Sequence, residues 1–177
     1  MKYKLLKNVS KYIIALMVLG LAACKVRYSF NDAKVNPNYK TINVVFFENK
    51  ARYINPQVSQ KLTDKLQQKI IGNTKLSRTQ DPNADYVVNS TITSYDATQT
   101  VGVSAQQASV NRLTVTIHVI WHKNKETDKE NAVEEFDISR SFDYPASYSM
   151  QQGETAVMDD LVRTLTDDIF NRMFSNW

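Results

Sequence analysis

The sequence is poor in the residues that build disulfide scaffolds and metal sites, with one cysteine and two histidines among 177 residues. A single thiol cannot form an internal disulfide, so a disulfide-stapled fold is excluded. His118 and His122 are four positions apart. On one strand this spacing is about 13 Å, at about 3.3 Å per residue, which is too far for two ligands of one zinc ion at about 2 Å each. We therefore expect no zinc site from these residues.

Glycine and proline are also scarce, with four of each in the chain. No stretch reads as an interdomain linker, and there is no glycine-rich loop of the kind that holds a phosphate group. The residues from Gly102 to Gln106 begin like the nucleophile elbow of a hydrolase, but the closing glycine of that motif is missing. We expect a single domain that is not an enzyme and uses no cofactor.

Neither sign of charge dominates the chain once its first residues are set aside. The four lysines before Cys24 leave 18 Lys and Arg against 18 Asp and Glu in the remainder. The pI near 9.1 of the whole chain therefore reflects its N-terminal stretch. Nothing in this balance indicates the basic face or stripe that nucleic-acid binding requires.

The chain also lacks a long apolar run. Ile13–Leu21 is about half of the roughly 20 residues that a membrane-spanning helix needs, and lysines precede it as in a secretory signal. Leu21-Ala22-Ala23-Cys24 resembles the bacterial lipobox, in which the cysteine receives diacylglycerol and becomes the new N-terminus after cleavage. We expect residues 1–23 to be a signal peptide and Cys24 to be lipidated. The alternative is an ordinary secretory signal with an incidental cysteine.

The residues after Cys24 indicate where the anchored protein lies. In many bacterial lipoproteins an aspartate directly after the cysteine retains the protein at the inner membrane, and acidic clusters direct others to the cell surface. Lys25-Val26-Arg27 fits neither pattern. Acyl chains contribute about 0.8 kcal/mol per buried methylene and stable anchoring takes more than one chain, which an N-acyl diacylglycerol on Cys24 would supply. We expect an outer-membrane lipoprotein on the periplasmic side.

Strand and helix patterns follow one another along the rest of the chain. A proline directly after Asn55 predicts a capped helix start, and Ser149 with Gln152 predicts a capping box. Alternation with a period of two predicts strands, and apolar residues at four-residue spacing predict helices. The expected elements are a strand at 41–47, a helix at 55–72, strands at 84–100, 113–122 and 136–142, and a helix at 149–177.

Rows of apolar residues predict the core. The third strand and the two helices each carry one such row, formed by Leu113, Val115, Ile117, Val119 and Trp121, by Val58, Leu62, Leu66 and Ile70, and by Val157, Leu161, Leu165, Ile169 and Met173. Lys61, Lys65 and Lys69 form a separate row on the first helix, which we interpret as a solvated edge, with an anion-binding edge as the alternative. The aspartates of the last helix are expected at its solvated surface.

The order strand, helix, three strands, helix (β-α-β-β-β-α) predicts an α+β fold, an α/β sandwich in which a four-stranded mixed sheet carries two helices packed on one face. The first two strands flank a helix, so we expect them to be parallel and joined by a right-handed crossover. Short connections make the later pairs antiparallel. Residues 24–40 are expected to be a lipid-anchored tether and residues 41–177 the single domain.

Four stretches carry a family resemblance: the lipobox, Tyr28-Ser29-Phe30, Asn111-Arg112-Leu113-Thr114-Val115 and the closing segment Asp168–Trp177. Together and in this order they are similar to the LptE-like lipopolysaccharide-assembly lipoproteins, over nearly all of the mature chain. The resemblance implies the two-helix, four-stranded fold. It also implies a lipoprotein that plugs an LptD-like outer-membrane β-barrel, supports its assembly and helps lipopolysaccharide reach the outer leaflet.

The resemblance further implies that basic residues bind lipopolysaccharide, although no motif places them. From charge and position alone we expect ligand or partner contacts from Arg112 at the third strand and from Lys123 and Lys125 in the turn after it. Their alternative interpretation is ordinary surface cations. The alternative function for the whole chain is a stand-alone periplasmic lipoprotein that binds a small ligand or another envelope complex.

Overall fold

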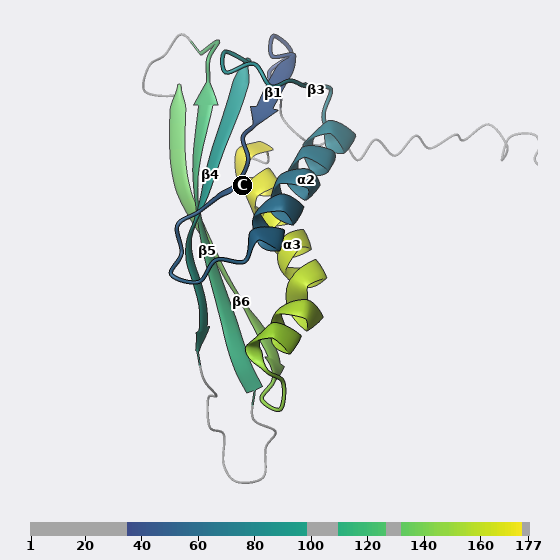
Figure 1. Cartoon of the computed structure of the whole chain (residues 1–177). Coiled ribbons are helices and arrows are strands. Elements are labelled where there is room, and N and C mark those ends of the chain that lie inside the picture. The colour runs from purple at the N-terminus through teal and green to yellow at the C-terminus, as the bar shows by residue number, and fades with distance from the viewer. Residues whose placement is uncertain (1–34, 99–109, 127–131, 175–177) are drawn as a thin grey trace, which may run out of the picture. The chain divides into compact units, whose positions relative to one another are not determined.

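The domain has two layers, a mixed sheet and two helices that lie on one of its faces (Figure 1). The computed structural model describes residues 35–98, 110–126 and 132–174. Its elements in chain order are β1 (Thr41–Val44), β2 (Glu48–Asn49), α2 (Pro56–Asn73), β3 (Ser77–Arg78), β4 (Tyr86–Thr98), β5 (Val110–Lys123), β6 (Val133–Pro145) and α3 (Met150–Phe174).

The strand order in the sheet is β3-β1-β4-β5-β6, and β2 also pairs with β4. β1 and β4 are parallel, whereas β4–β5 and β5–β6 are antiparallel. The α+β fold class, the mixed sheet and the parallel first pair predicted from the sequence are confirmed. The predicted strand number was too low by two, because β2 and β3 have two residues each and such short strands leave no periodic pattern.

The apolar run at 41–47 is not one strand, as its composition had suggested. β1 ends at Val44, and the Val45 N–H makes one more bond, to the Val88 carbonyl at 3.0 Å. Phe46 is then 54% exposed, while the N–H of the buried Phe47 donates to the Thr63 hydroxyl of α2 at 3.0 Å. The second half of the run therefore leaves the sheet and joins it to the helix layer.

The helix starts follow the caps predicted from the sequence. The Asn55 side chain accepts from the Gln57 N–H at 3.0 Å, with proline at the first helical position of α2. At the start of α3 the capping box is confirmed, since the Ser149 N–H donates to Gln152 Oε1 at 2.9 Å and the Gln152 N–H donates to Ser149 Oγ at 3.3 Å. Each cap satisfies N–H groups that a helix start leaves without intrahelical partners.

The core lies between the two layers, where the predicted apolar rows meet. Leu113, Val115, Ile117 and Val119 of β5 are fully buried, as is the row of α2, and the row of α3 is buried as well. Tyr39 also belongs to this core and stacks on Tyr86 with 4.3 Å between ring centroids. The packed domain therefore includes a residue of the segment 24–40. The opposite face of the sheet, called here the outer face, carries the alternate residues of β5 and β6.

Ion pairs tie α3 to both of its neighbours. Lys61 and Lys69 of α2 pair with Asp159 and Asp167 at 3.4 and 2.9 Å. On the other side, Arg140 of β6 pairs with Asp168 of α3 at 2.6 Å. Such surface pairs contribute about 0–1 kcal/mol each, so they orient the helix more than they stabilise the fold. Two of the three lysines in the row and three of the aspartates of α3 thus bridge elements, rather than lying only at a solvated surface.

Candidate functional site

The predicted lipid attachment residue, Cys24, lies outside the described residues. Its lipidation therefore stays a prediction. Among the residues that the structure describes, no helix is long and apolar enough to cross a membrane.

Arg112 lies on the outer face, near the start of β5, and is engaged by its cross-strand neighbour. Its Nε donates to Asp143 Oδ1 at 2.6 Å and its terminal nitrogen donates to Oδ2 at 2.9 Å. These hydrogen bonds lower the pKa of Asp143 and raise the pKa of Arg112. The Arg112 side chain is 46% exposed, so it still faces solvent.

Lys123 and Lys125 lie at the opposite end of β5. Lys123 falls on the core-facing side of the alternation, where its ammonium pairs with Glu134 and sits 4.5 Å from the centroid of the Trp121 ring. Lys125 pairs with Asp85 at 2.8 Å. The predicted cations do not form one site, because 11 residues of strand correspond to about 36 Å and Lys123 and Arg112 belong to opposite faces.

From Arg112 to His118, the outer face of β5 and β6 consists of directly hydrogen-bonded cross-strand pairs, and beyond them Ile120 lies opposite Glu135 and His122 opposite Val133. Besides Arg112–Asp143, the bonded pairs are Thr114–Ser141 at 2.9 Å, Thr116–Ser139 at 3.0 Å and His118–Asp137 at 2.8 Å. This part of the face therefore presents polar groups that share hydrogen bonds across the two strands. Within the described ranges, no group of three or more His, Cys, Asp or Glu residues is arranged to hold a metal ion.

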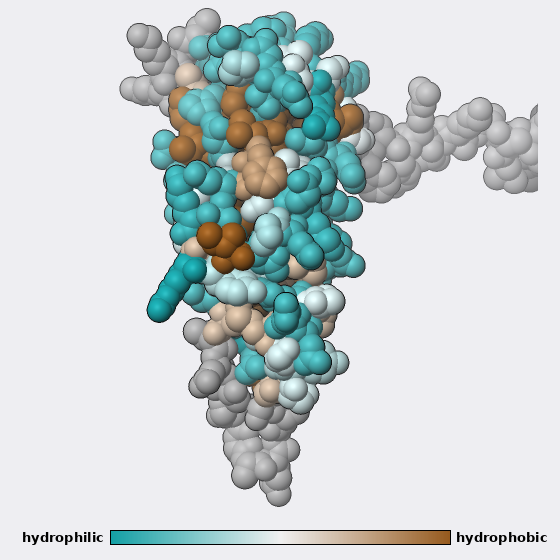
Figure 2. All heavy atoms as spheres, viewed as in Figure 1, coloured by the Kyte–Doolittle hydropathy of each residue, from teal (hydrophilic) through white to brown (hydrophobic). Residues whose placement is uncertain are grey.

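The surface in the view of Figure 2 is mostly hydrophilic, and hydrophobic side chains form separate patches on it. The most exposed large hydrophobic residues are Ile54, at 61%, and Phe46, at 54%. Both belong to the connection between β1 and α2. Scattered apolar side chains of this kind are ordinary for a soluble surface and do not by themselves mark a binding face.

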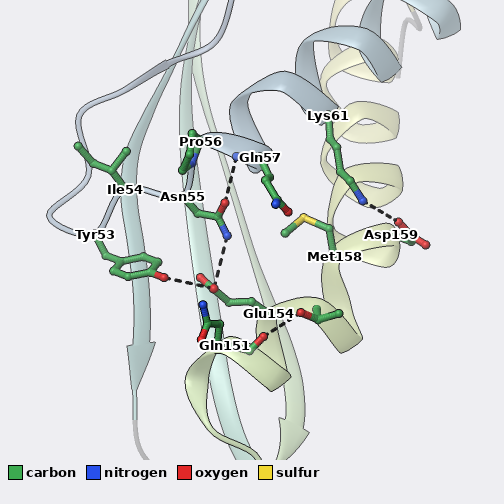
Figure 3. Close-up of a pocket in the computed structure, with 11 residues that line it drawn as sticks. Tyr53, Ile54, Asn55, Pro56, Gln57, Lys61, Gln151, Glu154, Met158 and Asp159 are labelled. Carbon is green, nitrogen blue, oxygen red and sulfur yellow. Dashed lines mark hydrogen bonds and ion pairs between the residues drawn. The ribbon is translucent and has the colours of Figure 1, made fainter.

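A pocket of about 480 Å³ lies where the N-termini of α2 and α3 approach each other (Figure 3). Its central group is the Glu154 carboxylate, which is only 3% exposed. Glu154 Oε2 accepts from the Tyr53 hydroxyl at 3.3 Å and from the Asn55 side-chain amide at 3.4 Å. The Glu154 carboxylate also interacts with the buried hydroxyl of Tyr95. Asn55 thus both caps α2 and reaches across to α3.

Two tyrosines share this carboxylate environment. Burial and the nearby charge of Glu154 raise the pKa of Tyr53, and the same two causes raise the pKa of Tyr95. The rings of Tyr53 and Tyr95 stack with 5.7 Å between centroids. Side chains of the connection before α2 and of β4 therefore surround the Glu154 carboxylate.

No motif in the sequence had indicated this pocket. One signal was available: Glu154 stands four residues before Met158 and eight before Val162, in a row that is mostly apolar. A charged residue in a buried row requires a partner or a ligand. The partners Tyr53 and Asn55 are about 100 positions away in the chain, so no local pattern reveals them.

Comparison with protein families gives a match to the LptE family of lipopolysaccharide assembly, over residues 39–173. The match spans more than three quarters of the chain. The chain belongs to the LptE lipopolysaccharide-assembly family. The resemblance predicted from the sequence is thereby confirmed. A comparison with curated proteins finds no match.

Solved structures share the fold of this LptE-family chain at low sequence identity. A putative neuraminyllactose-binding hemagglutinin homolog from Helicobacter pylori aligns at 11% identity and a TM-score of 0.57, covering 81% of this chain and 87% of its own. The hypothetical protein CT253 from Chlamydia trachomatis aligns at 8% identity and a TM-score of 0.48, covering 78% and 99%. At these identities the Helicobacter pylori structure supports the fold alone.

Membership of the LptE family places this chain among proteins of lipopolysaccharide assembly, a family without known catalysis or cofactor use. The matched residues cover the elements from β1 to nearly the end of α3. They include the paired outer face and the Glu154 pocket. The family match does not assign a role to either feature.

Proposed function

We propose that this chain is an outer-membrane lipoprotein that plugs an LptD-like β-barrel, supports the assembly of that barrel and assists lipopolysaccharide transport to the outer leaflet. The observation that carries this proposal is the LptE-family match over residues 39–173. In the proposal residues 1–23 are a signal peptide, and an N-acyl diacylglycerol on Cys24 anchors the domain on the periplasmic side.

The outer face of the sheet supports a plug by its chemistry. The lumen of an outer-membrane β-barrel is polar, and the cross-strand pairs of β5 and β6 present a polar surface to it. Those groups share hydrogen bonds across the two strands, and their remaining donors, such as the free N–H groups of Arg112, can bond to a polar wall. The 14 residues of β5 correspond to about 46 Å, which exceeds the roughly 25 Å apolar band of such a barrel.

The proposed contacts for lipopolysaccharide or the barrel remain Arg112, Lys123 and Lys125. Their ion pairs indicate how available each cation is for binding. Lys123 has a side chain only 17% exposed and is held by Glu134, so it is the least available. Arg112 has five N–H donors, of which Asp143 takes two. The remaining donors can bind a lipid phosphate while that pair stays intact. Arg112 is therefore the strongest of the three.

The proposal is tested by purifying the tagged full chain after detergent extraction of membranes. We expect a β-barrel protein to copurify in a one-to-one complex, and lipopolysaccharide to be captured with it. Arg112→Gln should reduce the captured lipopolysaccharide while the melting temperature stays unchanged. Arg163→Gln, which removes an exposed arginine of α3, is the matched control and should leave capture unchanged.

A purified chain that is monomeric and without any barrel partner would contradict the plug and favour the stand-alone binding protein. If the Arg112 and Arg163 variants capture equal amounts of lipopolysaccharide, Arg112 is an ordinary surface cation. That outcome would not affect the result for the barrel partner. The copurification and the capture therefore decide separate parts of the proposal.

A further inference from the structure

The strand at one edge of the sheet, β6, is long and has an unpaired side. The strand order places β6 last, beside β5, and no strand of the described residues pairs with its other side (Figure 1). β6 has 13 residues, whereas β3 at the opposite edge has two. An unpaired edge presents a row of backbone N–H and C=O groups to which a further strand can bond. β6 therefore offers a site for strand addition.

The hydrogen-bonding pattern identifies the groups in this row. The Lys123 N–H donates to the Ala132 carbonyl at 2.7 Å, and the register between β5 and β6 continues from there with His122 opposite Val133. Hydrogen-bonded pairs alternate along an antiparallel ladder, so the even-numbered residues of β6 bond to β5. The odd-numbered residues point their N–H and C=O groups to the free edge. All of them, from Val133 to Asp143, are exposed.

The edge carries few of the features that block strand addition. Lysine, proline and β-bulges commonly serve this purpose in natural sheets. β6 contains no lysine, its pairing with β5 runs in unbroken register, and its one proline, Pro145, is its last residue. The arginine within the strand, Arg140, is held at α3 by Asp168 at 2.6 Å. An incoming strand would therefore meet an open backbone from Val133 to Asp143.

The side chains along this edge define the strand that fits it. On the outer face the Glu135 and Asp137 side chains are 59% and 68% exposed. Both carboxylates lie near His118, and no lysine or arginine of the described residues pairs with them. On the other face Phe136 and Ile138 are only partly buried against the core. Opposite charges and apolar pairs stabilise neighbouring strands, so the fitting strand alternates basic or hydroxyl residues with apolar ones.

A second copy of the chain does not fit this edge, whereas a strand of an outer-membrane β-barrel does. β6 has four acidic residues and one arginine, so two β6 strands side by side would bring like charges together, which is destabilising. A transmembrane β-strand has about 9–11 residues, in which polar and apolar residues alternate. With 13 residues, β6 is long enough to pair with all of it.

We propose that the free edge of β6 binds an unpaired transmembrane strand of the barrel partner while the barrel is being assembled. Backbone hydrogen bonds to the odd-numbered residues of β6 supply the affinity, and basic residues of the barrel strand beside Glu135 and Asp137 supply the selectivity. The barrel strand leaves β6 when it pairs with its barrel neighbours, because every strand of a closed barrel is paired on both sides. This inference rests on the role in barrel assembly proposed above and deepens it.

The test measures binding of a fluorescent peptide to the purified full chain in detergent by fluorescence anisotropy. The peptide has about ten residues, the length of a transmembrane β-strand, and valine alternates in it with lysine and threonine. We expect saturable binding, and about tenfold weaker binding of a peptide with glutamate in place of lysine. Asp137→Lys should reverse this preference, whereas Asp160→Lys, which changes an exposed carboxylate of α3, should leave it unchanged.

A proline on the free edge tests the backbone directly. Ser139→Pro removes one N–H of that edge without removing a hydrogen bond to β5, because proline is tolerated where the N–H faces solvent. Ser139→Ala also loses the hydroxyl that bonds Thr116, but it keeps the N–H. We expect the proline variant to bind the lysine peptide about tenfold more weakly than the alanine variant. In cells, Ser139→Pro should also yield less copurified barrel than Ser139→Ala.

Three peptide results would overturn the proposal: no saturable binding to the folded chain, equal binding of the lysine and glutamate peptides, or equal affinities of the two Ser139 variants with intact melting transitions. A wild-type dimer that dissociates in Ser139→Pro would identify a second copy as the occupant and would overturn it as well. Equal amounts of copurified barrel from the two variants would exclude the role in assembly. Barrel copurification with the wild-type chain tests the proposed plug independently of all these results.

Discussion

At the scale of single residues, the close packing of α3 against β6 depends on a glycine, Gly153, because there is no room for a side chain there. A Cβ at Gly153 would lie 2.4 Å from two ring atoms of Tyr144, which is closer than real Cβ contacts occur. Tyr144 is buried and cannot swing into solvent without opening the core. A Cβ at the other helical glycine, Gly72 of α2, would have nothing within 4 Å. The two glycines therefore have different roles.

Gly153→Ala should destabilise the fold by about 1–3 kcal/mol, the usual range for an overpacked core. Gly72→Ala is the matched control, and it should be neutral or stabilising by up to about 1 kcal/mol, because alanine is the better helix former. Urea unfolding followed by circular dichroism measures both. Equal effects of the two substitutions would show that the Tyr144 contact does not limit the approach of α3.

At the scale of elements, Asp85 joins three parts of the sheet. Its carboxylate accepts from the Lys40 and Thr41 N–H groups at the start of β1, at 2.7 and 3.0 Å, and pairs with Lys125 after β5. Burial alone would raise its pKa. The hydrogen bond from Lys125 and those from the two backbone N–H groups outweigh burial and lower the pKa of Asp85 from 3.8 to about 2.

This junction predicts a pH dependence of stability. Because the folded pKa of Asp85 lies below the unfolded value of 3.8, its contribution is fully present above that pH and is lost as the pH falls towards about 2. Asp85→Asn should lower the melting temperature at neutral pH and weaken the fall in melting temperature between pH 4 and pH 2. Asp160→Asn, an exposed carboxylate of α3, is the control. Identical acid profiles for the wild type and Asp85→Asn would contradict the junction.

The elements also show which parts of the fold can be predicted from the sequence. Strict alternation predicted β5 because one face of that strand is buried and the other is polar. The strand extends beyond the prediction at both ends, since pairing continues from Val110 opposite Pro145 to Lys123 opposite Tyr86. Such pairing depends on a neighbouring strand, which a local pattern does not contain. For the same reason the two-residue strands β2 and β3 were missed.

Tertiary contacts limited the prediction of sites in the same way. Charge and position selected Arg112, Lys123 and Lys125, but each cation has an ion-pair partner supplied by another part of the fold. The Glu154 pocket forms only where two helix starts meet, so it has no sequence motif. Caps and apolar rows, which depend on neighbours in the chain, were predicted more reliably than pairings between distant segments.

At the scale of the whole molecule, the proposed anchor and the folded domain are close in sequence. The structure describes the chain from residue 35, and ten residues, 25–34, lie between that point and Cys24, the proposed lipidation site. A chain of that length spans at most about 40 Å when fully extended. An anchor at Cys24 would therefore hold the domain near the membrane surface, where a barrel partner is within reach.

Cys24→Ala tests this arrangement, because alanine offers no thiol for diacylglycerol and removes the proposed cleavage site for the lipoprotein signal. We expect unprocessed or mislocalised protein, measured by membrane fractionation and by mass spectrometry of the N-terminal peptide. Lys25→Asp is the matched variant: it keeps the thiol, so the chain should still be lipidated but remain at the inner membrane. If Cys24→Ala is still cleaved after Ala23 and fractionates with the outer membrane as the wild type does, Cys24 is an incidental cysteine and the domain reaches the membrane through its partner.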